Sequence, residues 1–195
     1  MQPGASADVP PRVPAGATPE GDGIVLGEGP VRVDAYIDFL CPFCRMFEER
    51  SGHVLDRLLD IGAISLVYHP LGFLDRLSTT RYSTRASAAS GCASDFGRFR
   101  PYKDALFANQ PPEGGPGLSQ ERLIELGAVA GVDDPGFPAC VAGGVHLPWS
   151  EYVTQRALER GVSGTPSVFV AGIPVPANGV TIEAAVAEIA RESLR

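Results

Sequence analysis

Residues 31–44 read VRVDAYIDFLCPFC, and the fold can be worked outward from this stretch. Positions 31–39 are rich in β-branched and aromatic side chains, which favours a buried strand. The CPFC motif follows at 41–44, and apolar residues then recur at helical spacing as far as Leu59. This order predicts that the CPFC motif lies where a strand passes into the first turn of a helix.

The segments that flank the motif predict a sheet. Residues 64–68 form a second candidate strand, which completes a β-α-β unit with a parallel pair and a right-handed crossover. Residues 24–26 suit an edge strand, and 167–170 with 173–175 predict a hairpin. Thr181 is the candidate cap of a final helix.

Residues 78–160 carry mainly helical signals. An alanine-rich segment runs through Cys92, and a second helix is indicated around 102–107. Ser119 is placed to cap a third helix, and a fourth begins near Trp149. The block between the two groups of strands is therefore predicted to be helical.

Composition favours a globular protein and argues against nucleic-acid binding. The chain has 195 residues, of which 44% are hydrophobic and 20% charged, so it can form a packed core. Its net charge of −7 offers no basic surface to neutralise phosphates. Residues 1–23 are rich in Pro and Gly and predict a flexible segment without an apolar signal core. For an exported protein, the signal or a membrane tether would lie outside this sequence.

The pair Cys41 and Cys44 is the strongest chemical signal in the chain. A thiol is nucleophilic as the thiolate, and the free N–H groups at a helix start stabilise that charge. A spacing of three residues lets the second sulfur close a disulfide with the first. We therefore expect an exposed Cys41 as the attacking thiol, with a pKa below about 8.5, and Cys44 as the resolving thiol.

A zinc site is the alternative interpretation of the CPFC motif. Zinc needs about four ligands, and the sequence contains no second CxxC and no closely spaced pair of histidines. His53, His69 and His146 are scattered along the chain, and we interpret them as surface or packing residues. The sequence therefore favours redox chemistry, for which no metal and no organic cofactor is expected.

Three segments together carry a resemblance to a known family. They are the CPFC motif at 41–44, GCASDFGRFRPYKDALFANQPP at 91–112 within the helical block, and GVSGTP at 161–166 before the hairpin. With them, the chain from residue 24 onward resembles the DsbA-like branch of the thioredoxin superfamily, in its extracytoplasmic, actinobacterial type.

The resemblance implies an α/β architecture. It implies a thioredoxin fold formed by residues 24–77 and 161–195, interrupted by an inserted α-helical domain over 78–160. Some relatives have a second disulfide in that inserted domain, which here would be a structural disulfide between Cys92 and Cys140. Two free thiols at these positions are the alternative.

The resemblance also implies roles for residues around the two cysteines of the motif. Pro166 would be a cis proline facing them, and the Thr165 backbone beside it would pair with a substrate peptide as an added strand. Pro42 and Phe43, which stand between the cysteines, would support the active site and contact the substrate.

Two positions depart from the family's pattern. Ala35 stands six residues before the first cysteine, where many thioredoxin-like proteins have a buried acid. The neighbouring Asp34 is expected on the other side of the strand, because adjacent side chains alternate. Asp38 is closer to the motif, but a polar residue at a strand end is an equal interpretation, so we assign no proton-transfer carboxylate. Phe43 replaces a His of the strongly oxidising relatives, which removes one group that stabilises the thiolate.

These observations predict a monomeric, extracytoplasmic thiol:disulfide oxidoreductase that introduces disulfides into exported proteins. Its substrates would be unfolded or partly folded proteins with cysteines. The resemblance implies reoxidation by a membrane partner of the DsbB or vitamin-K-epoxide-reductase type. Two alternatives remain open: the same fold working as an extracytoplasmic disulfide reductase, and a secreted non-catalytic binding domain with structural disulfides.

Overall fold

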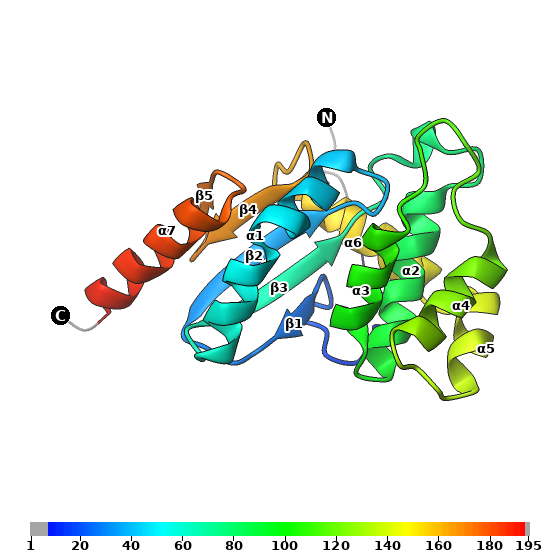
Figure 1. The fold of residues 1–195 in the computed structure, drawn as a ribbon, viewed down its shortest axis with the longest axis horizontal. Coiled ribbons are helices and arrows are strands. Elements are labelled where there is room, and N and C mark those ends of the chain that lie inside the picture. The colour runs from blue at the N-terminus through cyan, green and yellow to red at the C-terminus, as the bar shows by residue number, and fades with distance from the viewer. Residues whose placement is uncertain (1–7, 194–195) are drawn as a thin grey trace.

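A mixed sheet forms the centre of the molecule. The computed structural model describes residues 8–193, and within them a five-stranded sheet runs in the order β1-β3-β2-β4-β5 (Figure 1). Its strands are β1 (Ile24–Leu26), β2 (Val31–Ile37), β3 (Ile64–Pro70), β4 (Ser167–Val170) and β5 (Ile173–Val175). Strands β2 and β3 are parallel, whereas the pairs β1–β3, β2–β4 and β4–β5 are antiparallel. The predicted parallel pair and hairpin are both confirmed.

Helices connect and surround these strands. They are α1 (Pro42–Asp60), the short 3-10 helix η1 (Asp75–Leu77), α2 (Tyr82–Asp95), α3 (Phe99–Ala108), α4 (Gln120–Val129), α5 (Gly136–Ala142), α6 (Leu147–Glu159) and α7 (Gly179–Glu192). The sequence pattern does not indicate α5, because this helix spans seven residues and contains Pro138. The prediction of Thr181 as the cap of α7 is wrong, because the Asn178 side chain caps the helix by accepting the Thr181 N–H at 2.9 Å.

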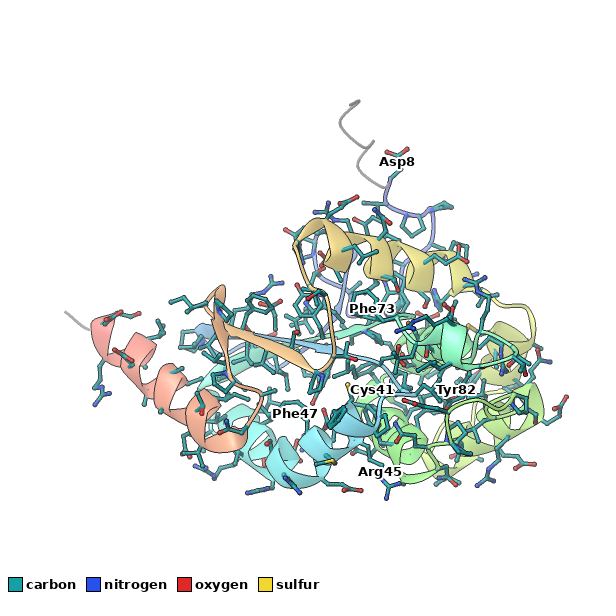
Figure 2. All side chains as sticks on the ribbon, turned by 90° about the horizontal axis from the view of Figure 1, so that it is seen from above. Asp8, Cys41, Arg45, Phe47, Phe73 and Tyr82 are labelled. Carbon is teal, nitrogen blue, oxygen red and sulfur yellow. A yellow bond between two sulfur atoms is a disulfide. The ribbon has the colours of Figure 1, made fainter. Side chains whose placement is uncertain are left out.

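The helices cover both faces of the sheet. Two perpendicular views show α1 and α7 on one face and α6 on the other, with α2 to α5 gathered beside the sheet (Figures 1 and 2). Helix α1 suits this position because apolar side chains spaced along one side are buried, among them Phe47, Leu55 and Leu58. Within residues 8–193, none of the helices combines the length and apolar character needed to cross a membrane.

The N-terminal segment differs from its prediction. Residues 1–7 lie outside the described chain, but residues 14–23 pack against the fold and are not a flexible tether. The buried Trp149 indole N–H of α6 donates to the Gly21 carbonyl at 2.8 Å, and the Asp22 side chain is fully buried. A buried indole needs such an acceptor, and the N-terminal chain supplies it. This contact makes the segment part of the packed structure.

Candidate active site

The CPFC motif lies at the carboxyl end of the parallel strands. Helix α1 begins at Pro42, so Cys41 is its capping residue and Cys44 belongs to its first turn. Proline suits this first helical position because an N–H there would have no partner within the helix. Figure 2 shows Cys41 between the strands and the inserted helices. The predicted place of the motif, between a strand and a helix, is confirmed.

The two sulfurs of the motif are free thiols in different surroundings. Cys44 is fully buried, and Cys41 is 4% exposed, so the expectation of an exposed first cysteine is wrong. The Cys41 thiol donates a hydrogen bond to the Thr165 carbonyl at 3.3 Å, and the Asp38 N–H donates to the Cys44 sulfur at 3.4 Å. The Thr165–Pro166 peptide bond is cis. A segment from far along the chain therefore lies directly against the first cysteine.

These surroundings move the two thiol pKa values in opposite directions. The hydrogen bond from the Cys44 thiol is the largest influence on Cys41 and, against the effect of burial, helps lower its pKa to about 6. Backbone N–H groups at the helix start lower this pKa as well. Burial raises the pKa of Cys44 well above its usual value. Of the two thiols, Cys41 is therefore the one that ionises more readily and loses its proton near neutral pH.

A buried carboxyl group stands next to the motif. Asp38 Oδ1 accepts hydrogen bonds from the Leu40 N–H at 2.8 Å and the Ser83 hydroxyl at 2.7 Å. Its Oδ2 accepts the Leu74 N–H at 2.9 Å. Burial, together with the negative charge of Cys41, raises the pKa of Asp38 to about 7. Through these hydrogen bonds, the Asp38 carboxyl group connects the segment before α1 with helix α2 and with the loop before η1. It ionises close to neutral pH.

Two contributors to this site are not assigned by sequence reasoning. From the sequence alone, Asp38 cannot be told from an ordinary polar residue at a strand end. The hydrogen bond that it accepts from Ser83, on a helix distant in the sequence, makes the difference. Gln110 follows α3 and donates from Nε2 to the carbonyls of Phe39 and Cys41, each at 3.0 Å. A single glutamine after a helix has no local signature. Only the tertiary structure shows that it holds the backbone of the motif.

A groove runs along the motif. It has a volume of about 780 Å³ and a mainly apolar lining. The lining includes Cys41, Pro42, Phe43, Phe73, Leu158 and Thr165. The Phe43 side chain is 66% exposed and also borders a second hollow of about 390 Å³, together with Met46 and Pro166. An exposed aromatic ring between two hollows suits the binding of an apolar segment of another chain.

The remaining cysteines and the histidines lie outside this groove. Cys92 and Cys140 form a disulfide that joins α2 to α5, with their Cα atoms 5.9 Å apart. His53 is exposed, whereas His69 and His146 are buried. Of the two predicted roles, His53 is therefore a surface residue, and His69 and His146 are packed in the interior. Each has a ring nitrogen within hydrogen-bond distance of a carboxylate, which is how the fold accommodates a buried imidazole.

A buried ion pair supports the start of α1. The Lys103 ammonium of α3 lies 2.6 Å from the Glu48 carboxylate of α1, and the two side chains are 4% and 9% exposed. The Tyr68 hydroxyl donates to the same carboxylate at 3.4 Å. Because a buried charge without its partner is strongly unfavourable, this pair fixes α1 against α3.

Comparisons with known proteins identify the family. The family model described as Thioredoxin matches residues 20–187. The structure is similar to the disulfide bond oxidoreductase DsbG from Mycobacterium tuberculosis, with a TM-score of 0.75 and 35% sequence identity, covering 88% of this chain and 87% of that chain. It is also similar to DsbA from the same organism, with a TM-score of 0.74 and 34% identity, covering 87% of this chain and 92% of that one.

The chain belongs to the thioredoxin superfamily and, within it, to the DsbA-like thiol:disulfide oxidoreductases, which are enzymes. The expected thioredoxin fold with an inserted α-helical domain is confirmed, and a non-catalytic binding domain is set aside. The chain is also 30% identical over 161 residues to the serine/threonine-protein kinase PknE of M. tuberculosis. That match covers 76% of this chain but spans 28% of the length of the kinase.

Proposed function

We propose that this enzyme introduces disulfides into exported proteins, with Cys41 as the sulfur that substrates attack and Cys44 as its resolving partner. The observation that carries this proposal is the unequal pKa of the two thiols, about 6 for Cys41 and well above the usual value for Cys44. A stabilised Cys41 thiolate favours the reduced enzyme. The Cys41–Cys44 disulfide is then the stronger oxidant.

The exchange takes two steps. A substrate thiolate attacks the Cys41 sulfur, and the Cys41–Cys44 bond breaks with its electron pair on Cys44. The Asp38 N–H, 3.4 Å from that sulfur, stabilises the new charge until Cys44 takes up a proton. A second substrate thiolate then attacks the substrate sulfur of the mixed disulfide, and Cys41 leaves as a thiolate. Two electrons pass from substrate to enzyme, one proton stays on Cys44 and the other enters the solvent.

The groove supports unfolded or partly folded proteins as substrates. Its apolar lining and the exposed Phe43 ring accept side chains that a folded protein would bury. The Thr165 backbone, beside Pro166, pairs with the substrate as an added strand. As in the family that the chain belongs to, a membrane partner of the DsbB or vitamin-K-epoxide-reductase type reoxidises the enzyme in an extracytoplasmic compartment, and the enzyme works as a monomer.

Oxidative folding of a reduced, unfolded ribonuclease tests this function. The oxidised enzyme is expected to restore ribonuclease activity stoichiometrically, and Cys41→Ser to abolish this. In a separate incubation with oxidised, scrambled ribonuclease, the Cys41 thiolate of Cys44→Ser attacks a substrate disulfide and releases a substrate thiolate. Because this variant lacks the resolving thiol, it should accumulate a mixed disulfide at Cys41 that mass spectrometry detects. His53→Ala, an exposed change on α1, is the matched control. An enzyme that reduces insulin but does not oxidise ribonuclease would instead be a reductase.

A further inference from the structure

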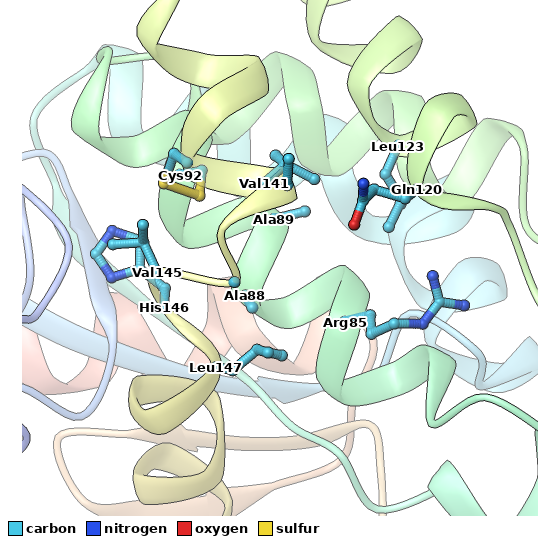
Figure 3. Close-up of a pocket in the computed structure, with 13 residues that line it drawn as sticks. Arg85, Ala88, Ala89, Cys92, Gln120, Leu123, Val141, Val145, His146 and Leu147 are labelled. Atoms are coloured by element: carbon cyan, nitrogen blue, oxygen red, sulfur yellow. A yellow bond between two sulfur atoms is a disulfide. The ribbon is translucent and has the colours of Figure 1, made fainter.

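A second cluster of chemically active side chains lies in the inserted helical domain, outside the CPFC site. Cys92 on α2 and Cys140 on α5 form the disulfide, and His146 stands immediately before α6. A ring nitrogen of His146 and the two sulfurs all lie within 4.8 Å of one another. Figure 3 shows the disulfide and the His146 ring next to each other at the edge of a cavity.

The His146 ring is oriented by a carboxylate. Its Nε2 lies 2.7 Å from Asp95 Oδ2, so this nitrogen is engaged with the carboxylate and Nδ1 is the ring nitrogen left for another partner. Within residues 8–193, Nδ1 has no hydrogen-bond partner, although the side chain is fully buried. The ring also makes a T-shaped contact with the Trp149 ring, with the ring centroids 6.2 Å apart. The ring therefore has a buried nitrogen without a partner and a carboxylate on its other nitrogen, which is the carboxylate–histidine arrangement found behind zinc-bound histidines.

We propose that Cys92, Cys140 and His146 bind a zinc ion when the Cys92–Cys140 disulfide is reduced. Two thiolates and an imidazole are donors that select zinc over magnesium or calcium. Bond lengths of about 2.3 Å to sulfur and about 2.0 Å to nitrogen put the ligand atoms of a tetrahedral site roughly 3.4–3.8 Å apart. The three ligand atoms now lie within 4.8 Å of one another and the two Cα atoms 5.9 Å apart, so rotation of the side chains after reduction is the movement that the proposed site requires.

The cavity next to the cluster provides the fourth coordination position. It has a volume of about 100 Å³, and its lining includes all three proposed ligands. A water molecule occupies about 30 Å³, so the cavity has room for one on the metal. Three protein ligands and one water is an established coordination for zinc. The remaining lining is largely apolar, with Ala88, Leu123 and Val145 among its members, and offers no competing sulfur or imidazole.

Zinc and the disulfide exclude each other at this site. A dithiol reductant transfers two electrons to the Cys92–Cys140 bond, which gives two thiols, and zinc then displaces their two protons. An oxidant of the disulfide class removes two electrons from the thiolates, re-forms the sulfur–sulfur bond and releases the ion. The redox state of this pair therefore decides whether the inserted domain holds zinc, whichever direction the CPFC chemistry takes.

Zinc titration of the reduced full chain tests the proposal. Cys41→Ser and Cys44→Ser first remove the other dithiol, and the protein is then reduced with a phosphine and freed of metal. Anaerobic titration should give one zinc per reduced chain, measured by native mass spectrometry, and none for the oxidised chain. Cobalt in place of zinc should give the thiolate-to-metal absorption band of a Cys-ligated site.

Substitutions at the histidine separate a ligand from a packing residue. His146→Phe should weaken zinc binding at least 100-fold, whereas His146→Cys, which supplies another zinc ligand, should retain it. Asp95→Asn should weaken binding by about 10–100-fold, because this carboxylate orients the ring. His53→Phe, an exposed change, should leave affinity unaltered. A reduced chain that takes up no zinc, or binds it equally after His146→Phe, overturns the proposal. Circular dichroism of each oxidised variant confirms that the comparison is between folded proteins.

Discussion

Replacing Asp38 by Asn should change how the stability of the reduced enzyme depends on pH. In the folded chain burial raises the pKa of this group to about 7, from a usual value of 3.8. Because the folded pKa is the higher one, the group's contribution to stability is fully present below about pH 4 and is lost as pH rises through 7. A difference of roughly three pKa units corresponds to about 4 kcal/mol.

The Asp38→Asn chain cannot undergo this ionisation. In the variant, an amide N–H₂ donor takes the place of one carboxylate oxygen. Both oxygens of Asp38 accept hydrogen bonds, from Leu40 and Ser83 or from Leu74, so this change lowers stability. That loss does not depend on pH, so it displaces the stability curve without changing its shape. The free energy of unfolding of the wild type, minus that of the variant, should therefore fall by about 4 kcal/mol between about pH 4 and pH 8.

Urea unfolding of both reduced chains at half-unit pH intervals measures this difference. Asp34, whose pKa its partners lower to about 2, titrates in both chains, and its effect cancels in the subtraction. A difference that stays constant from pH 4 to pH 8 would refute the reasoning. It would show that Asp38 is ionised throughout this range and that burial does not control its charge.

Three further predictions concern other parts of the molecule. Thiolate absorbance of the reduced enzyme should titrate with a midpoint near pH 6 that disappears in Cys41→Ser, and Phe43→His should lower the midpoint further; a midpoint above about 8.5 contradicts the assignment. Lys103→Met leaves the buried Glu48 carboxylate without its cation and should lower the free energy of urea unfolding by roughly 3–5 kcal/mol. Replacing Glu48 by an apolar residue as well should restore most of that loss. Replacing Cys92 and Cys140 by Ala removes a link across 48 residues and should cost about 4 kcal/mol; calorimetry showing an unchanged melting temperature would contradict this.

The parts of the fold that sequence patterns predict are the locally encoded ones. The strand before the CPFC motif and the helix after it are recognisable because alternation and helical periodicity each run over many residues. Ser119 is correctly predicted as a helix cap because capping depends on a backbone N–H three residues away. Pro166 stands out in the sequence because the GVSGTP motif, which it ends, comes immediately before the strand that begins at Ser167.

The parts that escape prediction depend on contacts between distant segments. Asp38 is distinguished from an ordinary strand-end residue by Ser83, 45 positions away. His146 is brought to the Cys92–Cys140 disulfide by the packing of three helices, and no ligand spacing in the sequence marks it. The packing of the N-terminal segment is hidden for the same reason, because its partner Trp149 lies 128 residues from Gly21.

The reduction potential of the Cys41–Cys44 pair tests the central claim most directly. The Cys41 pKa of about 6 lies between about 7 for thioredoxin and about 3.5 for DsbA, whose potentials are about −270 and −120 mV. Equilibration with glutathione or dithiothreitol buffers, followed by thiol alkylation and mass spectrometry, gives the potential of this pair. An oxidase requires a value between those two, clearly less negative than that of thioredoxin. A potential at or below about −270 mV would contradict the proposed function and indicate a reductase.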